Sequence, residues 1–223
     1  MIIVLASQEQ LLTEIEHLPE LIRAQGALYS KVRQRSFFSG RLLLKKCLHY
    51  FFDCESLPPI SVEAKGRPLL EGQGLPFFSL SHTGKMVAIA LGFKTLGLDV
   101  EQIKPRSEAL WQRVLSPQEL TALKNSSKPQ ELFTLLWTVR EALLKTDGRG
   151  LGGLSAVHCN LETKQAFYRH QNSGQVRSWR LDENLCMSAY VSSQEPQLHI
   201  YRLEGQNFIP LSLSPQYIFT LNK

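Results

Sequence analysis

Apolar residues in the first half of the chain recur at two different spacings, which predict helices followed by strands. Between Pro19 and Phe52 they return every three to four residues, as at Phe38, Leu42 and Leu48, and this predicts helix with a break near Ser36. Farther along, short apolar or alternating segments are separated by turn residues. The predicted strands cover residues 1–5, 60–64, 77–81, 86–91 and 97–101, with a turn at residues 65–68.

The second half of the chain repeats this order. A helix is predicted after Ser116, because this residue as N-cap, the proline that follows it and Glu119 form a capping box. A longer helix is predicted from Gln130 to Lys145, since its apolar residues fall on one side, and Gly148 and Gly150 predict its end. The predicted strands that follow cover residues 165–169, 185–191 and 198–203.

Helices followed by strands, occurring twice, predict an α+β fold built from two halves. The expected boundary lies near residue 105, which gives an N-terminal half of residues 1–105 and a C-terminal half of residues 106–223. Residues 79–91 and 184–192 resemble each other weakly, and this hints that one unit was duplicated.

The composition is that of an ordinary globular protein with a basic surplus. Of 223 residues, 43% are hydrophobic and 20% are charged, and no apolar run approaches the roughly 20 residues that span a bilayer. The first residues lack the basic flank of a signal peptide, so a cytoplasmic protein without a membrane segment is expected. The cysteines and histidines follow no metal-binding spacing, which argues against structural zinc. The net charge of +5 favours an anionic partner: nucleic acid, a polyphosphate cofactor or an acidic protein.

Asp99 and Glu101 are the first candidates for chemistry, because they stand two apart in a predicted strand. Side chains at this spacing share one face, while Leu98 and Val100 point to the other face. Two adjacent carboxylates repel each other unless a cation lies between them, and Mg²⁺ prefers carboxylate, water and phosphate oxygens. The alternative is a solvated polar strand face, and this pair alone does not exclude it.

Glu141 and Lys145 are four apart on the predicted long helix, so they lie on the same side, one turn from each other. On an open surface such a pair is an ordinary ion pair, which contributes about 0.3–0.5 kcal/mol. However, Trp137 lies one turn earlier, and the glycine loop at residues 148–150 follows directly. A charge pair between a large aromatic residue and a glycine loop favours the edge of a ligand site.

Ser81 and His82 stand where a predicted strand ends, just before Gly84. Backbone donors and side chains remain free at such ends, which favours contact with a ligand. A serine hydrolase is not indicated, because no Gly-x-Ser-x-Gly sequence surrounds any serine. The alternative at this point is a single structural histidine.

Together these segments resemble the Sfp-type 4'-phosphopantetheinyl transferases. The matching sequences stand in the family's order over roughly residues 33–151: Gly66-Arg67-Pro68, Phe78-Ser79-Leu80-Ser81-His82-Thr83, Gly97-Leu98-Asp99-Val100-Glu101, Trp137-Thr138-Val139-Arg140-Glu141-Ala142-Leu143-Leu144-Lys145 and Gly148-Arg149-Gly150. One position departs from the family, which usually has lysine where Arg140 stands. Because arginine has neither the shape nor the tunable pKa of lysine, this departure argues against proton transfer by Arg140.

The resemblance implies two similar α+β halves related by pseudo-two-fold symmetry, with the active site at their interface. It implies that Asp99, Glu101 and Glu141 bind Mg²⁺ on the pyrophosphate of coenzyme A. It also implies that Glu141, Lys145 and His82 are catalytic. The residues implied to contact coenzyme A are Arg33, Arg41, Arg67, Ser81, His82 and Lys145.

The implied reaction transfers 4'-phosphopantetheine from coenzyme A to a serine of an apo acyl or peptidyl carrier protein and releases adenosine 3',5'-bisphosphate. Fatty-acid, polyketide and nonribosomal-peptide carriers stay open, and the two-half form implies a monomer. Leu110 and Trp111 either meet the carrier or pack between the halves. One rival is a non-catalytic coenzyme A or nucleotide-binding module. The other is a magnesium-dependent nuclease, but no stretch of interleaved basic and aromatic residues indicates nucleic-acid binding.

Overall fold

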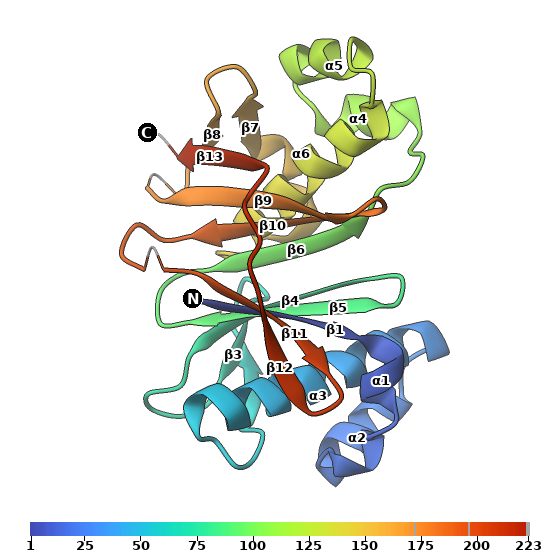
Figure 1. Ribbon diagram of the computed structural model, residues 1–223, viewed down its shortest axis with the longest axis vertical. Coiled ribbons are helices and arrows are strands. Elements are labelled where there is room, and N and C mark those ends of the chain that lie inside the picture. Colours follow the sequence, from blue (N-terminus) through green and yellow to red (C-terminus); the bar gives the residue numbers. More distant parts are fainter. Residues whose placement is uncertain (172, 196, 222–223) are drawn as a thin grey trace.

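The computed structural model describes residues 1–171, 173–195 and 197–221, and its helices and strands confirm the α+β fold (Figure 1). The helices are α1 (Gln8–Leu12), α2 (Glu20–Ala27), α3 (Lys31–Phe52), α4 (Glu108–Val114), α5 (Pro117–Lys124) and α6 (Pro129–Leu144), with short 3₁₀ helices at Ile15–His17 and Gly150–Ala156. The strands are β1 (Ile2–Ser7), β2 (Ile60–Val62), β3 (Pro68–Leu70), β4 (Phe77–Thr83), β5 (Met86–Gly92), β6 (Gly97–Gln102), β7 (Val157–Asn160), β8 (Gln165–Tyr168), β9 (Gln175–Asp182), β10 (Leu185–Val191), β11 (His199–Glu204), β12 (Asn207–Leu211) and β13 (Tyr217–Leu221).

These strands form two large sheets and one small hairpin. The first sheet has the order β12-β11-β1-β5-β4, the second has the order β6-β10-β9-β13-β8-β7, and β2 pairs with β3. In Figure 1 the second sheet lies above the first, with α3 below the first sheet and α6 beside the second. The predicted turn at residues 65–68 overlaps the connection of the β2–β3 hairpin, which consists of residues 63–67, while Pro68 already belongs to β3.

The first helical segment is interrupted, but the predicted position of its break is wrong. Residues 28–30 separate α2 from α3, and α3 continues through Ser36 without a break. The hydroxyl of Ser36 donates to the carbonyl oxygen of Val32 at 3.3 Å, a bond that lets a serine lie inside a helix. The chain turns instead just after Gly26, where any side chain would overlap the ring of Phe38 on α3.

The helices of the second half agree with the sequence pattern. The backbone N–H of Ser116 donates to Glu119 Oε2 at 2.7 Å and that of Glu119 donates to Ser116 Oγ at 3.3 Å, which confirms the capping box. Gly148 and Gly150 follow α6 with positive φ angles of 76° and 59°, a conformation that glycine adopts without strain. Within the described ranges, no helix combines the length and the apolar character needed to cross a membrane.

Three hydrophobic cores hold these layers together. One core lies between α3 and the first sheet, and a second lies between α6 and the second sheet. The third contains residues of both sheets, including Ile3 of β1, Val100 of β6 and Met187 of β10. Successive residues of β1 divide between two of these cores, since Ile3 lies in the third while Val4 lies in the core with α3.

The two sheets are not divided at the predicted boundary near residue 105. β6 precedes that boundary but is the first strand of the second sheet, and β11 follows it but pairs in parallel with β1 of the first. β1 lies between β5 and β11, so its second edge is covered only when the chain returns from the second sheet. The division into residues 1–105 and 106–223 stays a prediction about domains.

Candidate active site between a strand and a helix

The acidic residues of β6 lie on the face of the strand that α6 covers. The apolar residues of β6 are buried in the core between the sheets, so Asp99 and Glu101 point to the opposite face. Gly97 shares this face, and any side chain there would overlap the carbonyl oxygen of Ala142 on α6. Glycine at this position is therefore what allows the helix to approach the strand so closely.

Lys145 joins the end of α6 to β6 directly. Its ammonium group donates to Asp99 Oδ1 at 2.8 Å and to the backbone carbonyl of Leu98 at 2.9 Å. Glu141 lies one turn earlier on the same side of α6. The structure thus brings together an acidic residue of β6 and a basic residue at the end of α6 that are 46 positions apart in the chain.

Burial and neighbouring carboxyl groups raise the pKa values of Glu101 and Glu141. Burial and the negative charges of Asp99 and Glu101 raise the pKa of Glu141 to about 7, although the Lys145 ammonium opposes this change. Burial and Asp99 also raise the pKa of Glu101, while Arg106 opposes the change. Burial and the neighbouring carboxylates therefore both disfavour the charged forms of Glu101 and Glu141.

Two carboxylate oxygens of the cluster are buried without a hydrogen-bond partner among the described residues: Asp99 Oδ2 and Glu141 Oε1. The same part of the chain contains no ready-made group of three His, Cys, Asp or Glu side chains arranged to hold a metal ion. Nevertheless, buried carboxylate oxygens are unfavourable unless they are paired, and Mg²⁺ binds oxygens of this kind. Asp99 and Glu141 fit a divalent cation in this respect.

His82 and Ser81 lie next to the acidic cluster but differ in what their side chains do. His82 is solvent-accessible at the end of β4, and its pKa is lowered by partial burial and by the Lys145 ammonium, while Asp99 opposes this change. Ser81 is buried, and its hydroxyl donates to Asp99 Oδ1 at 2.7 Å. The contact of Ser81 with coenzyme A stays a prediction. In the structure its hydroxyl group donates to Asp99.

Arg67 lies in the turn of the β2–β3 hairpin. If Gly148 carried a side chain, its Cβ would lie 2.7 Å from the backbone nitrogen of Arg67, so the hairpin turn packs against the turn that follows α6. The Arg67 guanidinium lies over the ring of Phe77 at 4.6 Å, and one of its terminal nitrogens is buried without a partner in the described structure. Burial lowers the pKa of Arg67, but an arginine remains charged.

Arg41 and Arg33 lie on α3, away from direct contact with the acidic cluster. Arg41 lies over the ring of Phe37 at 5.0 Å and Arg33 over that of Tyr29 at 4.1 Å. Within the described residues, neither guanidinium forms an ion pair or hydrogen bond with a carboxylate. Burial lowers the pKa of Arg41, as it does for Arg67. Both arginines thus keep their donors free for an anion.

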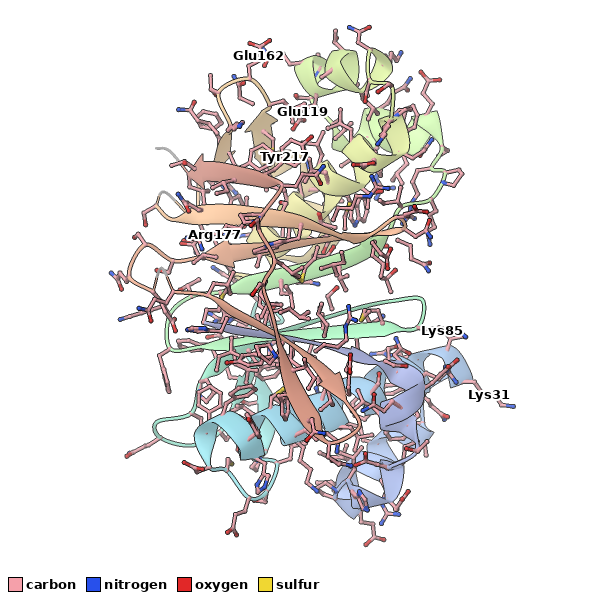
Figure 2. The ribbon with its side chains drawn as sticks, in the orientation of Figure 1. Lys31, Lys85, Glu119, Glu162, Arg177 and Tyr217 are labelled. Carbon is pink, nitrogen blue, oxygen red and sulfur yellow. The ribbon has the colours of Figure 1, made fainter. Side chains whose placement is uncertain are left out.

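Arg140 precedes Glu141 in the chain but points to a different part of the structure. Its side chain is fully buried, and its terminal nitrogen donates to Glu119 Oε1 at 2.7 Å and also to Glu119 Oε2. Glu119 also accepts from the backbone of Cys159 on β7 at 2.9 Å, and Figure 2 shows it between α5 and β7. Arg140 therefore braces α5, α6 and β7 against one another and takes no part in the acidic cluster.

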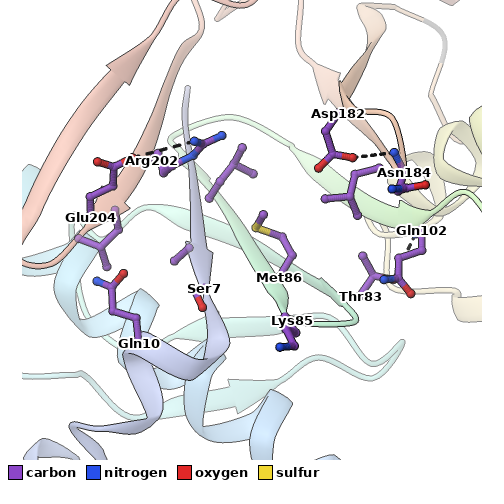
Figure 3. A pocket seen from close by; sticks show the side chains of 14 residues that line it. Ser7, Gln10, Thr83, Lys85, Met86, Gln102, Asp182, Asn184, Arg202 and Glu204 are labelled. Atoms are coloured by element: carbon purple, nitrogen blue, oxygen red, sulfur yellow. Dashed lines mark hydrogen bonds and ion pairs between the residues drawn. The ribbon is translucent and has the colours of Figure 1, made fainter.

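A separate cavity of about 470 Å³ opens between β1, β11 and the turn that joins β9 to β10 (Figure 3). Its lining includes Lys85, Met86, Asp182, Asn184, Leu185 and Arg202. No residue predicted for the active site lines this cavity, although Thr83 and Gln102 line it and adjoin His82 and Glu101. The cavity therefore adjoins the acidic cluster through Thr83, but it is not lined by the acidic residues themselves.

Comparisons with known proteins identify relatives of this chain. Residues 95–195 match the family model of the 4'-phosphopantetheinyl transferase superfamily. The chain is 28% identical over 181 residues to the 4'-phosphopantetheinyl transferase psf-1 of Bacillus pumilus, covering 76% of each chain. It is 30% identical over 152 residues to HetI of Nostoc sp., covering 64% of this chain and 63% of that one. A candidate 4'-phosphopantetheinyl transferase of Synechocystis sp. is 31% identical over 170 residues, covering 71% of this chain and 68% of the relative. The chain belongs to the 4'-phosphopantetheinyl transferase superfamily.

Membership in this superfamily confirms the family resemblance and the prediction that the chain is a transferase. Asp99, Glu101, Glu141 and Lys145 all lie within the residues that match the superfamily model. The basic residues implied to contact coenzyme A, with the exception of Lys145, precede that range: Arg33, Arg41, Arg67 and His82. The match therefore covers the acidic cluster more directly than it covers these basic positions.

Two further residues of this transferase contact the cluster and were not predicted as site residues. Thr83 donates its hydroxyl to Glu101 Oε2 at 3.3 Å, and Arg106 donates to the same oxygen at 3.3 Å. Thr83 continues the alternation of Ser79 and Ser81 along β4, so a signal for it existed in the sequence. Arg106 lies between β6 and α4, outside any periodic segment, and only the tertiary structure shows its contact.

Proposed function

We propose that this enzyme transfers 4'-phosphopantetheine from coenzyme A to a serine of an apo acyl or peptidyl carrier protein. Mg²⁺ is the proposed cofactor, and adenosine 3',5'-bisphosphate is the proposed second product. The proposal is carried by one observation: Asp99 and Glu141, near the Lys145 ammonium, each have a buried oxygen without a hydrogen-bond partner among the described residues. Superfamily membership supports the transfer, and this combination of acids with a cation supports a site for Mg²⁺ and a diphosphate.

Asp99 and Glu141 would hold the Mg²⁺, with Glu101 contributing directly or through a water. The fit rests on the buried oxygens Asp99 Oδ2 and Glu141 Oε1, which have no hydrogen-bond partner among the described residues. When bound, the ion supplies positive charge next to phosphate oxygens on which negative charge develops.

Lys145 and His82 are proposed to contact the phosphates. Lys145 is partly exposed, with 27% of its side chain accessible, so its ammonium can donate to a ligand as well as to Asp99. Fixed positive charge at this position stabilises the developing negative charge without reorganisation during the reaction. Among the described residues, Arg67 and Arg41 pair with no carboxylate, so their guanidinium donors suit the 3'-phosphate of coenzyme A. Arg33, at the start of α3, is an additional proposed contact.

Glu141 is proposed to accept the proton of the carrier serine, directly or through a water. The serine oxygen attacks the phosphorus that bears the pantetheine arm, a new P–O bond forms, and the bond to adenosine 3',5'-bisphosphate breaks. In the metal-free protein, burial and the nearby carboxylates raise the pKa of Glu141 to about 7; bound Mg²⁺ would favour the ionised carboxylate, which is the form that accepts a proton.

The test is incubation of the protein with coenzyme A, Mg²⁺ and a panel of apo acyl and peptidyl carriers. We expect a mass gain of one phosphopantetheinyl group on the carrier, which requires the acceptor serine and disappears in EDTA. Glu141→Gln should abolish the transfer, whereas the matched variant Glu131→Gln, which changes an α6 glutamate paired with Arg180, should not. Coenzyme A binding without transfer to any carrier would refute the proposal and favour a non-catalytic module.

The same assay addresses the carrier and the oligomeric state. Comparison of fatty-acid, polyketide and nonribosomal-peptide carriers identifies the preferred class from kcat/KM. Because one chain supplies both Asp99 and Glu141, we expect the active species to be a monomer. Light scattering at assay concentration checks this expectation.

A further inference from the structure

β4 provides a row of hydroxyl groups along the outer edge of β6. The two strands are terminal strands of different sheets, so the backbone donors on one edge of β6 have no neighbouring strand within their own sheet. The hydroxyls of β4 accept from these donors as follows: Leu98 N to Ser79 Oγ at 3.0 Å, Val100 N to Ser81 Oγ at 3.1 Å and Gln102 N to Thr83 Oγ1 at 3.2 Å. Side chains of one sheet thus replace the missing strand of the other.

Two of these three hydroxyls have a second role, because each also donates to an acidic residue of β6. Ser81 Oγ donates to Asp99 Oδ1 at 2.7 Å, and Thr83 Oγ1 donates to Glu101 Oε2 at 3.3 Å. Ser79 has no carboxylate partner in the described part of the chain. The row therefore contains one hydroxyl that only joins the sheets and two that also contact the acidic cluster.

Each carboxylate oxygen held by a hydroxyl is also held by a cation. Lys145 Nζ lies 2.8 Å from Asp99 Oδ1, and the Arg106 guanidinium lies 3.3 Å from Glu101 Oε2. The second oxygen of Asp99 is buried and has no partner among the described residues. Two donors of the protein thus hold one carboxylate oxygen of Asp99 and one of Glu101. This fixes the direction in which the second oxygen of each carboxylate points.

We propose that Ser81 and Thr83 are positioning residues, which hold one oxygen of Asp99 and Glu101 so that the second oxygen stays available to a divalent cation. This inference rests on the proposed function of the acidic cluster. In this proposal Ser81 acts through Asp99, by fixing the orientation of its carboxylate, and does not contact coenzyme A directly. Loss of such an outer hydrogen bond typically lowers metal affinity or activity about 10–100-fold.

The test compares Ser79→Ala, Ser81→Ala and Thr83→Val, with Thr83→Ser as the conservative variant that restores a hydroxyl. Because each of the first three loses a bond to a β6 N–H, all three should lower the Tm, roughly by 2–6 °C, and Ser81→Ala and Thr83→Val should lower it at least as much as Ser79→Ala because they also lose a bond to a carboxylate. Only Ser81→Ala and Thr83→Val should weaken Mg²⁺ binding in the presence of coenzyme A, about 10-fold or more by calorimetry. In transfer assays these two should lower kcat and leave the KM for the carrier unchanged.

Equal effects of all three variants on Mg²⁺ affinity would overturn the proposal. The three hydroxyl groups would then serve only to connect the two sheets. A loss of coenzyme A affinity in EDTA for Ser81→Ala, with an unchanged Mg²⁺ requirement, would also overturn it in favour of direct contact. If Ser81→Ala does not fold, the comparison of Thr83→Val with Thr83→Ser decides. Failure of the wild type to modify any carrier would refute the proposed function, whereas the Mg²⁺ titrations still test the positioning role.

Discussion

Replacement of Glu141 by glutamine should inactivate the enzyme and at the same time stabilise its metal-free fold at alkaline pH. Glu141 is largely buried near the negative charges of Asp99 and Glu101, and these features raise its pKa from the ordinary 4.5 to about 7. A raised pKa means that the folded state favours the protonated, neutral carboxyl group. The contribution of Glu141 to stability is therefore complete below about pH 4.5 and is lost as the pH rises through about 7.

The size of this effect follows from the difference between the two pKa values. A change from 4.5 to about 7 corresponds to about 3 kcal/mol, at about 1.4 kcal/mol for each tenfold change in the ionisation constant. Contact of the carboxyl group with solvent reduces this figure, so we expect about 1–3 kcal/mol. Glutamine is neutral at every pH and of nearly the same shape, so Glu141→Gln should recover this stability above pH 7 and leave the stability near pH 4.5 unchanged.

The assay is urea denaturation of both proteins in EDTA at pH 5 and pH 8.5. The variant should gain stability relative to the wild type at pH 8.5 and lose most of this advantage at pH 5. The matched control Glu131→Gln, which removes an ion pair with Arg180, should not become more stable at either pH. A stability difference between Glu141→Gln and the wild type that does not change with pH would refute this account of the cluster.

Three further substitutions test other parts of the structure. Arg140→Met leaves the buried carboxylate of Glu119 without its cation and should cost about 3–5 kcal/mol in urea denaturation, with transfer per folded molecule largely retained. Gly97→Ala should force α6 away from β6 and lower both the Tm and kcat, whereas Gly152→Ala, whose added methyl group would meet no heavy atom within 4 Å, should change neither. Arg67→Ala should raise the KM for coenzyme A about 10–100-fold, the equivalent of about 1.5–3 kcal/mol for a charged hydrogen bond, and an unchanged KM would place this guanidinium outside the coenzyme A site.

The sequence alone determined the parts of this protein that depend on residues close together in the chain. The spacing of Asp99 and Glu101 placed both on one face of a strand, and the spacing of Glu141 and Lys145 placed both on one side of a helix. The capping box at Ser116 followed from the same kind of local rule, since the interacting groups are three residues apart. Local patterns succeed here because the repeat of a helix or strand fixes which neighbouring side chains share a face.

The tertiary structure alone decided how these local units meet. Nothing in the pattern around Arg140 shows that its partner is Glu119, 21 positions away, rather than the cluster that includes its neighbour Glu141. Likewise, β11 returns to pair with β1, although nearly the whole chain separates them. Such contacts depend on the packing of whole helices and sheets, which sums many small interactions between distant residues. Ser81 on β4 and Lys145 at the end of α6 both donate to Asp99 Oδ1, and Oδ2 has no partner among the described residues; only the tertiary structure shows this arrangement.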